Sequence, residues 1–128
     1  MRKIKRVISR QPLRIRKGKK AEQQAEHYLH QKGLKTVCRN FHSPRGEIDL
    51  IMTEGNTLVF IEVRSKRSCR YGHPLETIND MKQNRIITTA HWFLTQHTAF
   101  RKNPSRFDAI SLIQNKIHWV QNAFTTRP

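Results

Sequence analysis

The chain has 128 residues, of which 25 are Lys or Arg and only 9 are Asp or Glu, giving a formal net charge of +16. A chain of this length forms one domain with a proper core, and its charge favours an anionic partner, nucleic acid first. No apolar run approaches the roughly 18 residues that a membrane span requires, which argues against a membrane protein. Two cysteines, Cys38 and Cys69, form neither a disulfide framework nor a zinc pattern, so we expect a reducing, cytoplasmic location.

The positive charge is concentrated at the start of the chain. Residues 1–20 contain ten Lys or Arg and no acid. We therefore expect a disordered basic arm over 1–17, one folded domain over 18–124 and a short tail over 125–128. The arm lacks the apolar region of a secretory signal, and an organellar transit peptide is the less favoured interpretation.

Periodicity and turn residues predict seven elements in the order α-β-β-β-α-β-β. Apolar positions at helical spacing predict a first helix that stops at Gly33. This order indicates an α/β (α+β) fold with a mixed central sheet flanked by helices. In chain order, the predicted elements are a helix over 19–32, strands over 34–41, 46–51 and 58–64, a helix over 75–97, and strands over 107–113 and 117–120.

The second and third predicted strands carry three of the nine acids, although apolar strands normally contain no charged residues. A two-residue turn at Gly55-Asn56 would set Asp49 opposite Glu62. One face of this hairpin would then be apolar core and the other a charged cluster. Opposed carboxylates repel, and a hard divalent cation with oxygen ligands would offset the repulsion. The plainer alternative is a solvated strand face with a chance pair of acids.

Basic side chains outside the arm are candidates for phosphate contact. Three lie in the loop that follows the hairpin, and two lie on the second predicted helix, where a solvated helix face explains them equally well. The candidates are Lys66, Arg67, Arg70, Lys82 and Arg85.

The spacing of these acids resembles a known signature. Asp49, followed by Glu62-Val63-Arg64, looks like the Asp…(Asp/Glu)-x-Lys signature of restriction-endonuclease-like nucleases, and the helical Glu22 matches the extra acid of archaeal Holliday junction resolvases. A longer ordered set resembles the bacterial YraN-like family, described as endonuclease-like, over about residues 18–124. The set comprises Gly18-x-x-x-Glu22-x-x-Ala25, Asn40, Gly46-Glu-Ile-Asp-Leu-Ile51, Val59-Phe-Ile-Glu-Val-Arg64, Lys82 with Arg85, and Arg106-Phe-Asp108.

The resemblance implies a restriction-endonuclease-like core with a metal site. Asp49 and Glu62 would bind Mg²⁺ (or Mn²⁺) together with the Val63 carbonyl, and Glu22 would complete or support the site. Glu47, which the predicted register sets opposite Arg64, joins the candidate catalytic residues.

Position 64 departs from the broad nuclease signature, which has Lys there. Arg64 stays protonated, so it cannot act as a base, although it can stabilise a phosphate oxyanion. Lys66 shares the strand parity of Arg64 and is an alternative cation for the site.

The leading expectation is therefore a Mg²⁺-dependent endonuclease that hydrolyses phosphodiester bonds of DNA, with branched or damaged structures as candidate substrates. The alternative is a non-catalytic nucleic-acid-binding module on the same fold. A third interpretation is an RNA- or ribosome-associated basic protein whose acids only support structure. Formation of a homodimer is a further possibility that the sequence does not decide.

Overall fold

Within the residues that the computed structural model describes, 19–66 and 78–125, five strands and two α-helices follow the predicted order. The predicted basic arm, most of the predicted tail, and Arg67 and Arg70 lie outside these residues, and so do the side chains of Lys19 and Lys66. The elements are α1 (Lys19–Gln31), β1 (Lys35–Ser43), β2 (Gly46–Glu54), β3 (Thr57–Lys66), α2 (Asp80–Gln96), the 3-10 helix η3 (Thr98–Phe100), β4 (Ser105–Ile113) and β5 (Lys116–Phe124).

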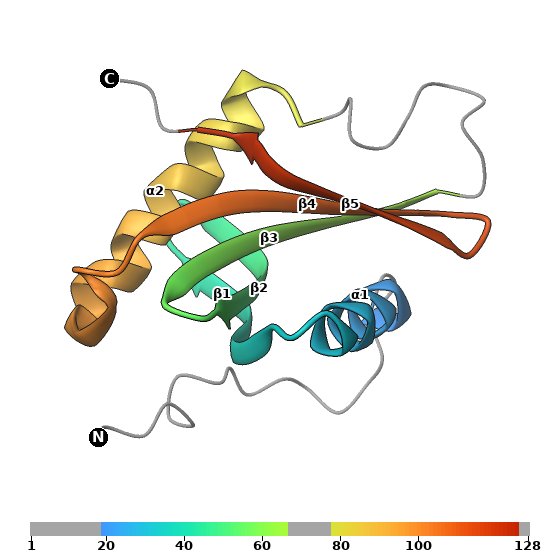
Figure 1. The fold of residues 1–128 in the computed structure, drawn as a ribbon. Coiled ribbons are helices and arrows are strands. Elements are labelled where there is room, and N and C mark those ends of the chain that lie inside the picture. Colours follow the sequence, from blue (N-terminus) through green and yellow to red (C-terminus); the bar gives the residue numbers. More distant parts are fainter. Residues whose placement is uncertain (1–18, 67–77, 126–128) are drawn as a thin grey trace.

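The strands form one sheet in the order β1-β2-β3-β4-β5 (Figure 1). Neighbouring strands are antiparallel except β3 and β4, which are parallel. Parallel neighbours need a crossover connection, and the segment containing α2 provides it. The sheet is therefore mixed, and the α+β class predicted from the element order is confirmed.

Both faces of the sheet are buried. Leu58 and Phe60 on β3 belong to a core cluster with Phe93 of α2, whereas Val59 and Ile61 belong to a second cluster with Leu29 of α1. Because side chains alternate along a strand, the two helices cover opposite faces of the sheet.

The prediction of one charged face on the hairpin is wrong over most of its length. Ile51 and Phe60, which share that face with the acids, are fully buried under α2. On this face, the charged side chains are confined to the end of the hairpin away from its turn.

The predicted register of β2 and β3 is confirmed where the two strands pair. Glu54 pairs with Thr57 and Leu50 with Ile61, around a turn at Gly55-Asn56. Gly55 adopts a positive φ of 59°, which the tight turn demands.

The helix ends follow local capping chemistry. α1 ends at Gln31, one residue before the predicted end, and Gly33 with φ 98° closes it while the Leu34 N–H donates to the Leu29 carbonyl. The predicted start of the second helix, Leu75, lies outside the described residues, but Ile78 and Asn79 are not helical. α2 begins at Asp80 because the Asn79 side chain accepts a hydrogen bond from the Lys82 N–H at 2.9 Å.

The last two strands are longer than predicted. Gln114 and Asn115 form the turn, both with positive φ, and β5 continues to Phe124 rather than ending at Val120. The apolar signal fails after Val120 because β5 is an edge strand whose side chains are mostly exposed.

No helix in the described part of the chain is long and apolar enough to cross a membrane.

A buried carboxylate ties the last two strands together. Asp108 on β4 is fully buried and accepts hydrogen bonds from the Arg106 Nε, the Trp119 Nε1 and the Asn122 N–H at 2.9–3.1 Å. Arg106 also bonds Glu54 of β2 at 2.7 Å. Arg106-Phe-Asp108 therefore has a structural role, because the buried carboxylate joins donors from both strands and, through Arg106, reaches β2.

Asp108→Ala should lower the free energy of unfolding by about 3 kcal/mol, since it leaves a largely buried guanidinium and an indole N–H without their acceptor. Urea unfolding of the variant and of the exposed control Gln121→Ala would measure this difference. A loss no greater than that of the control would contradict the structural role of Asp108.

Candidate metal and phosphate site

The candidate site lies where β2 and β3 stop pairing. The last antiparallel pair is Leu50 with Ile61, and Asp49 and Glu62 are the next residues on the two strands. Beyond that pair, an Asp49 carboxylate oxygen accepts the Val63 N–H at 2.8 Å, so the side chain replaces the partner strand. Both carboxyl groups are buried, with 8% of Asp49 and 6% of Glu62 exposed.

Burial raises the pKa values of both groups, and at Asp49 the charge of Glu62 adds to this effect. Burial raises the pKa of Asp49 well above its usual range, the charge of Glu62 raises it further, and the Val63 N–H only partly opposes this. Burial also raises the pKa of Glu62, against the opposing charges of Lys82 and Arg64 and a hydrogen bond with Asp49. The raised pKa values therefore disfavour the state in which both groups are ionised.

Two cations flank one oxygen of Glu62. The Lys82 Nζ and the Arg64 Nε each lie 3.4 Å from its Oε2. The Arg64 Nε is buried and makes no hydrogen bond with any described residue, so the Glu62 carboxylate at 3.4 Å is its ionic partner there. Sequence patterns placed Lys82 only on a helix face, and its approach to β3 depends on how α2 packs on the sheet.

The other buried carboxylates are matched by donors, and this contrast singles out Asp49. Glu26 on α1 bonds the Arg39 Nε at 2.9 Å and the Thr36 hydroxyl. Burial would raise the pKa of Glu26, but these bonds outweigh it and the pKa is lowered. Asp108 is satisfied by Arg106, and Glu62 has Lys82 and Arg64. Asp49 has no ion pair with any described residue.

Two further predicted acids lie near the pair without joining it. Glu22 accepts a hydrogen bond from the Asn40 Nδ2 at 2.9 Å, and Glu47 lies 3.2 Å from the His42 Nδ1. The charges of both raise the pKa of Asp49. In the described structure, no three His, Cys, Asp or Glu side chains gather closely enough to hold one ion together. An ion would therefore use Asp49 and Glu62, supplemented by main-chain or solvent oxygen.

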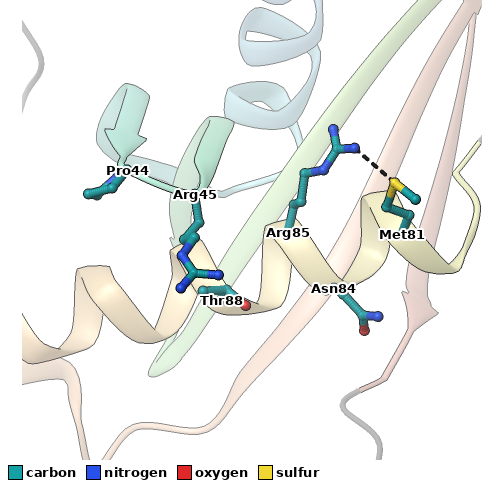
Figure 2. Close-up of a pocket in the computed structure, with 6 residues that line it drawn as sticks. All are labelled: Pro44, Arg45, Met81, Asn84, Arg85 and Thr88. Carbon is teal, nitrogen blue, oxygen red and sulfur yellow. Dashed lines mark hydrogen bonds between the residues drawn. The ribbon is translucent and has the colours of Figure 1, made fainter.

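Of the predicted phosphate contacts, Lys82 lies beside the pair and Arg85 faces a cleft. The cleft has a volume of about 600 Å³ and is lined by Pro44, Arg45, Met81, Asn84, Arg85 and Thr88 (Figure 2). Sequence analysis missed Arg45, whose only signal was its place in the loop before Gly46-Glu47. The backbone of Lys66 ends β3, while Arg67 and Arg70 lie outside the described residues.

Comparison with known proteins finds one matching family model. Residues 21–112 match the Uncharacterised protein family UPF0102. A UPF0102 protein of Legionella pneumophila strain Corby is 46% identical over 110 residues, which cover 84% of this chain and 93% of the relative. UPF0102 proteins of Pseudomonas aeruginosa strain LESB58 (40% over 114 residues, 84% and 91%) and Pseudomonas fluorescens strain Pf0-1 (37% over 112 residues, 86% and 93%) are also similar.

The buried pair makes the stability of the metal-free protein depend on pH. Because the folded protein holds the Asp49 proton more tightly than the unfolded chain, the contribution of this group to stability is greatest below the ordinary Asp pKa of about 4. It falls as the pH rises from there through the raised pKa. Asp49→Asn keeps an oxygen for the Val63 N–H and cannot ionise, so we expect its melting temperature at pH 7.5 to rise by about 4 °C, or roughly 1 kcal/mol.

Thermal unfolding in EDTA at pH 4 and pH 7.5 would measure this effect. Glu54→Gln makes the same charge change on the same strand away from the pair, and because it removes the ion pair with Arg106 it should lower the melting temperature at pH 7.5, the opposite direction to Asp49→Asn. A lower melting temperature for Asp49→Asn at pH 7.5, or a gain of equal size at both pH values, would contradict the assignment.

Proposed function

The chain belongs to the family UPF0102, and we propose that it is a metal-dependent nuclease that hydrolyses phosphodiester bonds of DNA. One observation carries the proposal: Asp49 and Glu62 are buried side by side, with their pKa values raised, in a protein of net charge +16. A protein that only binds nucleic acid gains nothing from two carboxylates, because they repel the phosphate backbone of the nucleic acid. A restriction-endonuclease-like core, as the resemblance implies, is part of this proposal.

The donor set fits a hard divalent cation. Mg²⁺ takes oxygen ligands and keeps several waters, so two carboxylates and a main-chain oxygen are enough. The cation would relieve the Asp49–Glu62 repulsion that no described basic group relieves at Asp49. When bound, it would polarise the phosphate and lower the pKa of a coordinated water.

Arg64 and Lys82 supply the positive charge for the phosphate. Both contact Glu62, and the guanidinium of Arg64, whose side chain is 29% exposed, can donate to a phosphate oxygen that enters the site. In the broader nuclease signature, a lysine at position 64 supplies an ammonium group. Here Lys82 of α2 brings an ammonium group to Glu62 instead. The departure at Arg64 therefore leaves the site with a lysine, contributed by a different element.

The same contacts favour one alternative. Glu62 is already neutralised by Lys82 and Arg64, as expected for a site that has lost its metal. The alternative is thus a non-catalytic nucleic-acid-binding module on the same fold, and metal binding and cleavage distinguish the two.

Calorimetry should show Mg²⁺ or Mn²⁺ binding to the wild type, and Asp49→Asn and Glu62→Gln should abolish it. The same variants should cleave linear, nicked or four-way-junction DNA at least about 100-fold more slowly, because charge developing in the transition state loses its stabilisation. Glu54→Gln should leave both properties unchanged. If the wild type binds no divalent cation at millimolar concentration, with or without DNA, the metal site is wrong.

Substitution of the two cations tests their roles. Arg64→Ala and Lys82→Met should each lower the cleavage rate about 100-fold while leaving DNA affinity nearly intact, since each is one of 25 basic residues. Arg64→Lys should retain or raise cleavage, because a mobile ammonium still reaches the phosphate. If these proteins and the wild type bind DNA tightly yet cleave none of the substrates with any metal, the binding module replaces the nuclease.

A further inference from the structure

The cleft beside the carboxylate pair has two walls from distant parts of the chain. Pro44 and Arg45 form one wall, in the turn between β1 and β2, and the solvent-facing side of α2 forms the other (Figure 2). Its volume of about 600 Å³ is that of a small-molecule pocket. The cleft therefore offers room for a compact group.

Close contacts fix the two walls relative to each other. The Ser43 hydroxyl bonds the Thr89 hydroxyl at 3.1 Å, and the Thr89 hydroxyl also donates to the Arg85 carbonyl at 2.8 Å. A Cβ on Gly46 would lie 3.3 Å from the Thr89 Oγ1 and 3.5 Å from the Arg85 Cβ, so glycine permits the close approach. The cleft is therefore preformed.

The lining combines positive charge with exposed apolar surface. Arg45 and Arg85 bring two guanidinium groups, and none of the six lining residues is acidic. Met81 is 63% exposed, and its sulfur accepts a hydrogen bond from the Arg85 Nη2 at 3.0 Å, as the dashed line in Figure 2 shows. Asn84 adds an amide that can donate and accept.

This combination matches one unpaired nucleotide better than a duplex backbone. Duplex phosphates need cations on an accessible surface, without a hollow or an apolar platform. An unstacked base needs an apolar or guanidinium plane to pack on and polar groups at its edge, and its phosphate needs a cation. We propose that the cleft binds a base and phosphate of a single-stranded segment.

The position of the cleft links this segment to the carboxylate pair. Lys82, which contacts Glu62, lies between Met81 and Arg85 on the same turns of α2. On the other wall, β2 runs from Gly46 beside the cleft to Asp49, roughly 10 Å of extended chain. This part of the inference rests on the proposed nuclease function: the preferred substrate carries unpaired nucleotides a few positions from the cut.

Binding measured without metal tests the cleft independently of catalysis. Fluorescence anisotropy in EDTA would compare a labelled 12-nucleotide oligothymidine with a 12-base-pair duplex. Arg45→Ala/Arg85→Ala should weaken binding of the single strand about tenfold more than binding of the duplex. Met81→Ala, which changes no charge, should weaken single-strand binding about threefold through lost apolar contact and leave duplex binding unchanged.

The matched control is Arg101→Ala/Lys102→Ala, which removes two exposed cations from the segment before β4. It should weaken both ligands equally, through general electrostatics. As a second readout, an oligonucleotide containing 5-iodouracil should cross-link to residues 44–45 or 81–88 of the wild type, and the cross-link should be lost in the double cleft variant.

If the double cleft variant weakens both ligands equally, as the control does, the cleft is not a single-strand site. That result would leave Mg²⁺-dependent cleavage, measured separately, untouched. Conversely, selective loss of single-strand binding in a protein that cleaves nothing would support the cleft and reject the nuclease.

Discussion

The structure depends on one unfavourable contact, the burial of Asp49 beside Glu62 where β2 and β3 separate. Elsewhere in the described structure the fold treats buried carboxylates conventionally, giving Glu26 and Asp108 guanidinium partners and further donors. At Asp49 the described structure supplies no basic partner: the group accepts the Val63 N–H, shares a hydrogen bond with Glu62 and is surrounded by other acids. Proteins keep such arrangements mostly at functional sites, because strain there serves binding or catalysis.

The two helices determine the surroundings of this contact. α1 and α2 cover opposite faces of the sheet, so the pair is shielded from solvent while Lys82 reaches Glu62 from α2. The same helix carries Met81 and Arg85 on its solvent side, beside the fixed turn at Arg45. The buried carboxylate pair and the cleft, for which we propose a reacting phosphate and an unpaired nucleotide, therefore both involve residues on a few turns of one helix.

The sequence predicted what depends on local pattern. The element order, the Gly55-Asn56 turn and the register of β2 against β3 follow from alternation and turn chemistry. The burial of Ile51 and Phe60 under α2 did not follow, because an alternating strand cannot show whether its second face is covered. The contacts of Lys82 and Arg45 depend on how α2 lies across the sheet, which no short-range spacing encodes. The prediction ended β5 too early because an edge strand with mostly exposed side chains carries little apolar signal.

The parallel pairing of β3 with β4 has a kinetic consequence. It joins Leu58 to Ser105, far apart in sequence, whereas β2 and β3 pair through a two-residue turn. Short-range hairpins close quickly, and parallel pairs with long crossovers close late. Asp49 and Glu62 thus meet while still hydrated, and dehydration comes only when α2 and β4 dock. We therefore expect the energetic cost of the pair to arise late in folding, when α2 and β4 dock, rather than when the hairpin forms.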